Sequence, residues 1–217
     1  MNRTVAVNKR AQKRIQSLNL WVYKSDVINH DGAAREIKNG EIVNVTDETG
    51  RFLAQAYFSG LSQITLRILT RQAGEKIGES FIKTRLADAL NRRRSTIDFN
   101  KTSIIRLLNS EADFLPGLIV DKYGDTLVLQ SLSAGAENFI EYAVEFYQKE
   151  LSPSGILIKN DAPVRKLEGL PLHAAWRGNP VTEARRVLSD GIYYLIDFAG
   201  GQKTGFFADQ RRAYELL

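Results

Sequence analysis

The stretch with the richest chemistry in this sequence is GGQKTGFFADQR, residues 200–211. Its glycines let the backbone turn sharply or approach a ligand closely. Its other side chains supply hydrogen-bond donors and flat apolar surface: Gln202, Lys203, Thr204, Phe206 and Phe207. On composition alone, this combination favours a glycine turn with two core phenylalanines and a following helix capped by Asp209. The alternative is a ligand-binding turn.

Other catalytic patterns are scarce. GGQKTG is not a phosphate loop, because Gln202 stands where that motif needs a glycine before the lysine, and no GxGxxG occurs in the chain. The chain has no cysteine and two histidines, His30 and His173, which we interpret as ordinary surface or packing residues. We therefore predict no metal site and assign no catalytic residue.

The charge is unevenly divided along the chain. Residues 1–106 contain 19 Lys and Arg against 10 Asp and Glu, whereas residues 107–217 contain 11 against 15, so the net charges are +9 and −4. No acid precedes Asp26. A basic front half suggests a polyanionic partner, with RNA or DNA as the leading candidate, but charge alone supports a solvated Lys/Arg surface of no special purpose equally well.

Two groups of cations are candidate phosphate contacts. In NKRAQKRIQ, helical spacing would place four on one face: Lys9, Arg10, Lys13 and Arg14. Residues 80–98 are predicted to be helical and end in Arg92, Arg93 and Arg94. Cations suit the last turn of a helix, but three in succession exceed what capping needs, which favours RNA binding.

The surrounding elements read as a mixed α+β protein. The segments IVNV, FLAQAYF and QITLRIL are strand-like, and the alternation of Ile64, Leu66 and Ile68 with Thr65 and Arg67 is typical of a half-buried strand. Further strands are expected in 102–109, 117–121, 126–132 and 155–160, with a hairpin turn at Gly124, one amphipathic helix over 136–151 and a second hairpin around Ser189–Gly191.

Composition fits a cytosolic protein. No apolar run approaches the length of a membrane helix, the first residues do not form a secretory signal, and the absence of cysteine excludes disulfides.

Three spaced motifs resemble the large-subunit ribosomal RNA methyltransferase I family: DFLPGLIVDKYGDTLVLQ at 113–130, DAPVRKLEGL at 161–170 and GQKTGFFADQR at 201–211. LWVYKSDV at 20–27 and SQITLRIL at 62–69 resemble the PUA domain of that family, a small RNA-binding β-barrel. The resemblance covers nearly the whole chain in the right order. It implies an S-adenosylmethionine-dependent enzyme that methylates C5 of a cytosine in ribosomal RNA.

The resemblance also implies a domain plan. We expect a PUA-like RNA-binding domain at 1–72, a connecting helix at 73–101, a central α+β domain of strand-strand-helix-strand-strand type at 102–186, and the start of a Rossmann-like methyltransferase domain at 187–217. Carried over residue by residue, the third motif implies cofactor-binding or cleft-lining roles for Gln202, Lys203, Thr204, Phe206, Phe207, Asp209 and Arg211. Phe206 or Phe207 would stack a flipped base or the adenine.

Methylation at C5 normally needs a cysteine thiolate that adds to C6, and this chain has none. The chain also reaches Leu217 before the strand expected to seat the cofactor. We therefore expect the RNA-recognition portion of an rRNA methyltransferase, truncated and inactive alone, with S-adenosylmethionine bound in the full-length enzyme and not by this chain. The alternatives are a free-standing PUA-type RNA-binding module without enzymatic activity and a structural fragment whose basic face contacts protein.

Overall fold

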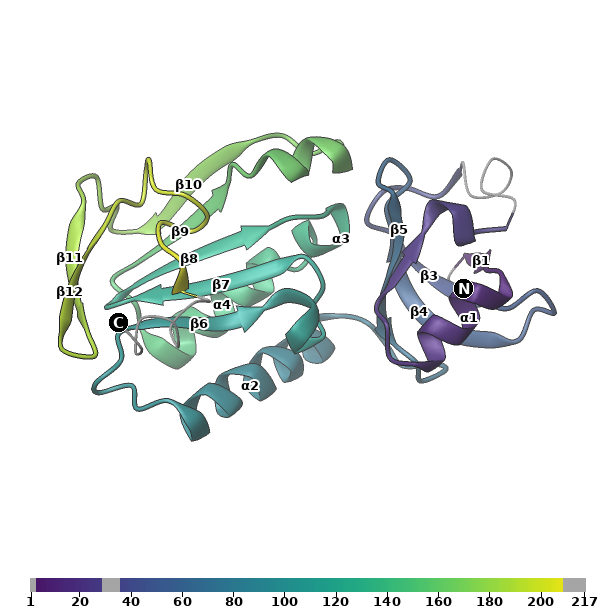
Figure 1. Ribbon diagram of the computed structural model, residues 1–217, viewed down its shortest axis with the longest axis horizontal. Coiled ribbons are helices and arrows are strands. Elements are labelled where there is room, and N and C mark those ends of the chain that lie inside the picture. The colour runs from purple at the N-terminus through teal and green to yellow at the C-terminus, as the bar shows by residue number, and fades with distance from the viewer. Residues whose placement is uncertain (1–2, 29–35, 209–217) are drawn as a thin grey trace.

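The structure is a computed structural model that describes residues 3–28 and 36–208. It has two lobes, an N-terminal domain built on strands β1–β5 and a larger domain built on strands β6–β10, to which a hairpin is attached (Figure 1).

The N-terminal domain is a curved five-stranded sheet of order β1-β3-β4-β5-β2. Its strands are β1 (Thr4–Ala6), β2 (Trp21–Tyr23), β3 (Ile42–Thr46), β4 (Phe52–Phe58) and β5 (Ile64–Thr70). An isolated bridge between Val7 and Val27 draws the two ends of the sheet together. Helix α1 (Lys9–Gln16) places Ala11 and Ile15 in the core of the sheet, and a 3₁₀ helix η1 (Lys24–Asp26) follows β2.

Strand β5 differs from the half-buried strand that its alternation predicts. Thr65 and Arg67, on the polar face, are as buried as Leu66 and Ile68 on the apolar face. Arg67 is buried because the second domain covers its guanidinium, which forms an ion pair with Glu168 there.

The second domain contains a five-stranded sheet of order β10-β9-β8-β7-β6, in which β8 and β9 are parallel and the other pairs are antiparallel. Its strands are β6 (Ile104–Asn109), β7 (Leu118–Tyr123), β8 (Thr126–Ser131), β9 (Gly155–Asn160) and β10 (His173–Gly178). Three strands therefore precede the crossover helices, as the three strand-like segments predicted, whereas the domain plan implied by the resemblance has two. The turn at Gly124, with φ of +62°, is confirmed.

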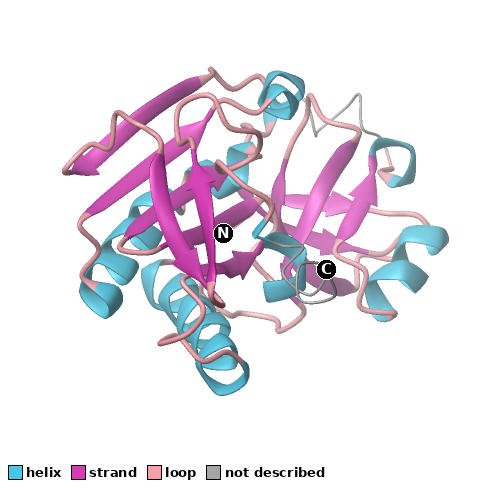
Figure 2. Ribbon diagram, turned by 60° about the vertical axis from the view of Figure 1, so that its left-hand side comes forward, coloured by secondary structure: helices cyan, strands magenta, loops and turns pink. Residues whose placement is uncertain are grey.

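Helices cover one face of this sheet (Figure 2). Helix α2 (Glu79–Thr96) confirms the helix expected from about residue 80. The single helix expected over 136–151 is instead divided into α3 (Ala134–Glu137) and α4 (Ile140–Leu151). Ser133 caps α3, and the buried Phe139 lies at the break between the two helices.

Loops and a hairpin lie over the opposite face. The 3₁₀ helices η3 (Ser110–Asp113) and η4 (Pro163–Glu168) follow β6 and β9. The hairpin expected around Ser189–Gly191 is confirmed as β11 (Arg185–Ser189) and β12 (Ile192–Ile196). Val187, Ile196 and Phe198 pack on Ile104, Tyr123, Val128 and Leu157, so residues 197–208 are held against the sheet.

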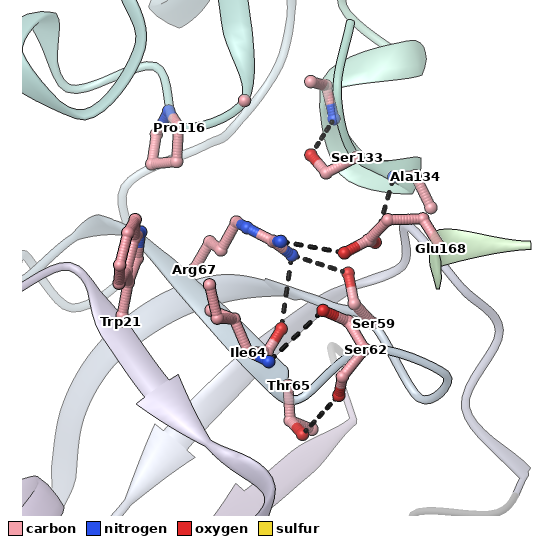
Figure 3. A network of polar contacts seen from close by, with 12 residues as sticks. Trp21, Ser59, Ser62, Ile64, Thr65, Arg67, Pro116, Ser133, Ala134 and Glu168 are labelled. Carbon is pink, nitrogen blue, oxygen red and sulfur yellow. Dashed lines mark hydrogen bonds and ion pairs between the residues drawn. The ribbon is translucent and has the colours of Figure 1, made fainter. Parts of the chain in front are cut away.

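The two domains meet through a polar junction (Figure 3). Arg67 of β5 donates to Glu168 of η4 at 2.8 Å, and the other carboxylate oxygen of Glu168 accepts from the Ala134 backbone N–H. The Tyr57 hydroxyl donates to the Pro116 carbonyl and accepts from Ser133. These buried bonds fix the N-terminal domain against the sheet of the second domain.

Gly135 is expected to tolerate no side chain at this junction. A Cβ atom there would lie 2.0 Å from Cγ of the Tyr57 ring, which is itself fixed by its two hydrogen bonds. We expect Gly135→Ala to lower the free energy of unfolding by about 1–3 kcal/mol or more, as overpacking does. Urea denaturation measures it, with Gly78→Ala as the control. A Cβ at Gly78 meets nothing within 4 Å, so that loss should stay under about 1 kcal/mol. Equal losses would contradict the assigned close contact.

Candidate functional site

A pocket of about 530 Å³ lies between the sheet of the second domain and the segment Gly201–Lys203. Strands β6, β7 and β8 form one side, and the loop that leads into η4 forms another. The lining residues are Arg106, Ile119, Gln130, Leu132, Asp161–Val164 and Gly201–Lys203. The volume and the mixture of apolar walls with a few polar groups are those of a small-molecule or nucleotide site.

The pocket rests on a buried ion pair. The β6–β7 register sets Arg106 opposite Asp121, and the guanidinium donates to both carboxylate oxygens at 2.8 Å. Asp121 is fully buried. The bidentate pairing satisfies its charge, which makes a rigid wall for the pocket.

Thr204 joins the glycine-rich segment to that ion pair. Its hydroxyl donates to Asp121 at 2.5 Å and lies 2.6 Å from the hydroxyl of Tyr123. Burial, reinforced by the Asp121 charge, raises the pKa of Tyr123 well above its ordinary value, so the phenol stays protonated.

Two further side chains, from strands β8 and β9, hydrogen-bond to the backbone of the segment 201–204. The Lys159 ammonium is almost fully buried and donates to the Gly201 carbonyl at 2.6 Å. The Gln130 amide donates to the Lys159 carbonyl at 3.0 Å and to the Lys203 carbonyl at 3.3 Å. The backbone of 201–204 is therefore positioned by side chains from β7, β8 and β9.

The residues predicted from GQKTGFFADQR occupy different environments in the structure. Gln202 and Lys203 are exposed and line the pocket, whereas Thr204 is buried beneath it. Phe206 packs against Tyr194 with ring centroids 5.2 Å apart, and the Lys203 ammonium lies 4.4 Å from the centroid of the Phe207 ring. Asp209 and Arg211 lie outside the described residues.

Sequence reasoning missed Arg106, Gln130 and Lys159. Each lies on a strand, and only the pairing register reveals that they share one face of the sheet with the pocket. The charges of Arg106 and Lys159 within apolar strands were the available signal, because a buried cation must find a partner.

Helix α1 carries the first predicted RNA-binding group. Arg10 and Arg14 both bind the fully buried Asp26, at 2.7 and 3.3 Å, and Arg14 also lies over the Tyr23 ring. Lys9 and Lys13 are exposed. Thus Arg10 and Arg14 neutralise the buried Asp26, whereas Lys9 and Lys13 leave an exposed basic face on the helix.

The second predicted group, at the end of α2, is divided in a similar way. Arg93 is largely buried and donates to both oxygens of Asp113 at 2.6 Å, and Arg92 adds a third bond at 2.7 Å. Burial raises the pKa of Asp113, but the hydrogen bonds and charge of Arg93 outweigh it, so the net shift is downward. Arg94 makes a longer contact, 3.4 Å, with the exposed Glu150.

Within residues 3–28 and 36–208, no three His, Cys, Asp or Glu side chains come together as metal ligands. His173 is exposed at the start of β10, and His30 lies outside the described residues. The described part of the chain also contains no helix with the length and apolar character to cross a membrane.

Comparison with known proteins first defines the class. The PUA-like domain family matches residues 5–71, so the N-terminal domain is PUA-like. A Streptococcus mutans protein described as an S-adenosylmethionine-dependent methyltransferase superposes with a TM-score of 0.78 and 18% identity, over 97% of this chain and 52% of its own. A second structure, described as a methyltransferase complexed with S-adenosylhomocysteine, superposes with a TM-score of 0.79, again over 97% of this chain and 52% of its own. At this identity the likeness is one of fold.

The sequence relatives are named ribosomal RNA large subunit methyltransferase I. The protein of Alteromonas mediterranea is 35% identical over 97% of this chain and 52% of its own length. Those of Tolumonas auensis and Klebsiella pneumoniae are 33% identical over 97% and 94% of the chain. The chain is a homologue of these proteins, and the resemblance inferred from its motifs is confirmed. It spans about half the length of the curated relatives it matches.

One prediction is corrected by these matches. We expected only the RNA-recognition portion of a cytosine-C5 methyltransferase, without its catalytic core, or else a free-standing PUA-type RNA-binding module without enzymatic activity. That prediction is wrong, because the similarity does not stop at the PUA-like domain. Methyltransferases match 97% of the chain by fold and up to 100% by sequence. The expectations of an inactive chain and of no bound cofactor have no support, and neither has specificity for C5.

Proposed function

We propose that this protein takes part in the S-adenosylmethionine-dependent methylation of large-subunit ribosomal RNA. The observation that carries the proposal is the similarity to proteins named for that activity along 94–97% of the chain. A PUA-like domain, a basic N-terminal half and a nucleotide-sized pocket support it.

In this proposal the regions of the chain have different tasks. Residues 1–72 bind RNA, residues 73–101 connect, residues 102–186 form the central α+β domain, and residues 187–217 begin a Rossmann-like methyltransferase domain. Phosphates are contacted by cations of α1 and α2: Lys9, Arg10, Lys13, Arg14, Arg92, Arg93 and Arg94. Among these, the exposure of Lys9, Lys13 and Arg94 favours direct contact. A cytoplasmic location follows from the proposed substrate.

The pocket beside Gly201–Lys203 is proposed as part of the methyl-transfer cleft. Ile119, Leu132 and Val164 provide apolar walls for a flat heterocycle, while Gln202 and Lys203 provide exposed donors at the rim. These residues fit a nucleotide or the adenosine part of the cofactor. When bound, S-adenosylmethionine supplies an electrophilic methyl group. Thr204, Phe206, Phe207, Asp209 and Arg211 complete the proposed cleft-lining set.

The RNA-binding part of the proposal predicts a sequence-independent loss on changing Lys9 and Lys13 together to alanine. Each lysine that neutralises a phosphate releases counterions, so we expect affinity to fall about three- to tenfold and the salt slope to shrink by about 1.4. Fluorescence anisotropy with unmodified large-subunit rRNA fragments, titrated at several salt concentrations, measures both.

The control is Lys149→Ala on α4, an exposed cation outside both predicted groups. It should leave affinity and slope close to those of the parent. An RNA affinity that does not change with salt, or that falls equally in the control, would contradict phosphate contact by α1.

A further inference from the structure

We propose that Phe114 and Arg85 form a stacking site for a nucleobase of single-stranded RNA, beside the junction of the two domains. The inference rests on the proposed function, because it names a place where the RNA is held. Neither residue was among the predicted contacts.

The backbone at Phe114 is unusual. The residue follows η3 with φ of +59° and ψ of +24°, in the left-handed region that bulky side chains seldom adopt. Its neighbours impose this conformation. Asp113 is bound by Arg92 and Arg93, the Phe114 N–H donates to the Glu111 carbonyl, and Leu115 is buried. Such strain persists only where the surroundings over-determine it, and it is common at ligand-binding positions.

With this backbone conformation, Phe114 is 37% exposed. Arg85 of α2 lies between this ring and the buried ring of Phe81, with its guanidinium carbon 5.3 Å and 5.1 Å from the two centroids. Within the described part of the chain, Arg85 forms no ion pair with an acid. An aromatic face beside an uncompensated planar cation matches what single-stranded nucleic acid requires, a surface for the base and a charge for the phosphate.

The site lies between the two predicted basic groups. Arg92 is two turns beyond Arg85 on α2, with its side chain half exposed. On the other side, Trp21 of β2 donates to Glu111 of η3 at 2.9 Å, which brings the N-terminal domain next to the loop that carries Phe114. A strand bound to the α1 lysines and the end of α2 would therefore pass this ring. In Figure 1, α1 and α2 both lie in the lower half of the molecule.

The experiment compares variants at Phe114 by anisotropy with a short fluorescein-labelled single-stranded RNA. We expect Phe114→Ala to weaken binding about tenfold, the loss typical of one stacked base, and Phe114→Trp to retain the parent affinity. RNA should also quench the fluorescence of the introduced indole. Leu195→Ala, at an exposed apolar residue of β12, is the control and should bind like the parent.

A purely structural role for Phe114 predicts different results. Phe114→Gly, which suits the left-handed backbone, should unfold near the parent temperature yet bind RNA as weakly as Phe114→Ala. Parent-like binding by Phe114→Ala, or equal losses for the alanine and tryptophan variants, would overturn the stacking site while leaving the proposed function intact. A parent protein that binds neither this RNA nor rRNA fragments would refute the proposed function itself.

Discussion

Replacing Asp113 by alanine is expected to lower the free energy of unfolding by about 3–5 kcal/mol, because it leaves a buried cation without its partner. Asp113 accepts two hydrogen bonds from Arg93, one from Arg92 and one from the Asn109 N–H. Without the carboxylate, the largely buried Arg93 keeps, among the described residues, only its bonds to the carbonyls of Arg106 and Ala89.

Equilibrium urea denaturation measures the loss. Glu150→Ala is the control, since Glu150 pairs with Arg94 at the same end of α2 but both side chains are exposed, and such pairs contribute less than about 1 kcal/mol. Equal losses of unfolding free energy in the two variants would show that the group of hydrogen bonds to Asp113, here called the Asp113 cluster, does not stabilise the fold more than an exposed ion pair does.

The Asp113 cluster also predicts how the free energy of unfolding depends on pH. The pKa of this carboxyl is lowered in the folded protein, so its stabilisation is present above the ordinary carboxyl pKa of about 4 and is lost as the pH falls below that value. The stability difference between parent and Asp113→Ala should therefore narrow in acid. A difference that widened as the pH fell would contradict this sign.

Removing Glu168 is the second large effect that we expect. Glu168→Ala leaves the buried Arg67 and the Ala134 N–H without their carboxylate at the domain junction, which should lower the free energy of unfolding by about 3–5 kcal/mol. Because Pro163 and Val164 of the same 3₁₀ helix line the pocket, the variant should also weaken ligand binding there.

A second substitution tests whether the loss comes from the stranded charge. Adding Arg67→Met to Glu168→Ala should recover part of the stability, because no buried cation is then unpaired. Glu141→Ala, which removes an exposed partner of Arg177, is the control and should change the free energy of unfolding by less than about 1 kcal/mol. If the double variant were less stable than Glu168→Ala by the full cost of Arg67→Met alone, the two residues would not be coupled.

Local chemistry made much of the fold predictable. Gly124 and the Ser189–Gly191 turn mark hairpins because positive φ is needed there, and α2 follows from its apolar stripe. The polar face of β5 could not be predicted, because alternation does not reveal that another domain covers Arg67. Likewise, the break before α4 depends on how Phe139 packs, which a helical pattern does not record.

The site was predictable only in part for a related reason. Gln202 and Lys203 stand in a motif for which the family resemblance implies cleft-lining roles, and they do line the pocket. The ion pair of Arg106 with Asp121 depends on strand register, and charge alone did not reveal that Arg10, Arg14 and Arg93 neutralise buried carboxylates. A run of cations in sequence therefore overstates the exposed positive charge.

The prediction of a missing catalytic core failed because it was drawn from absent features, a cysteine and a further strand. Similarity along the chain is a positive observation, and it extends over 97% of the chain by fold and up to 100% by sequence.

The most direct test is the methylation state of large-subunit ribosomal RNA in cells with and without the gene for this protein, measured by mass spectrometry of nuclease fragments. We predict that one methylated nucleotide of the large-subunit RNA disappears when the gene is deleted and returns when it is restored. Unchanged methylation of the large-subunit RNA after deletion would contradict the account.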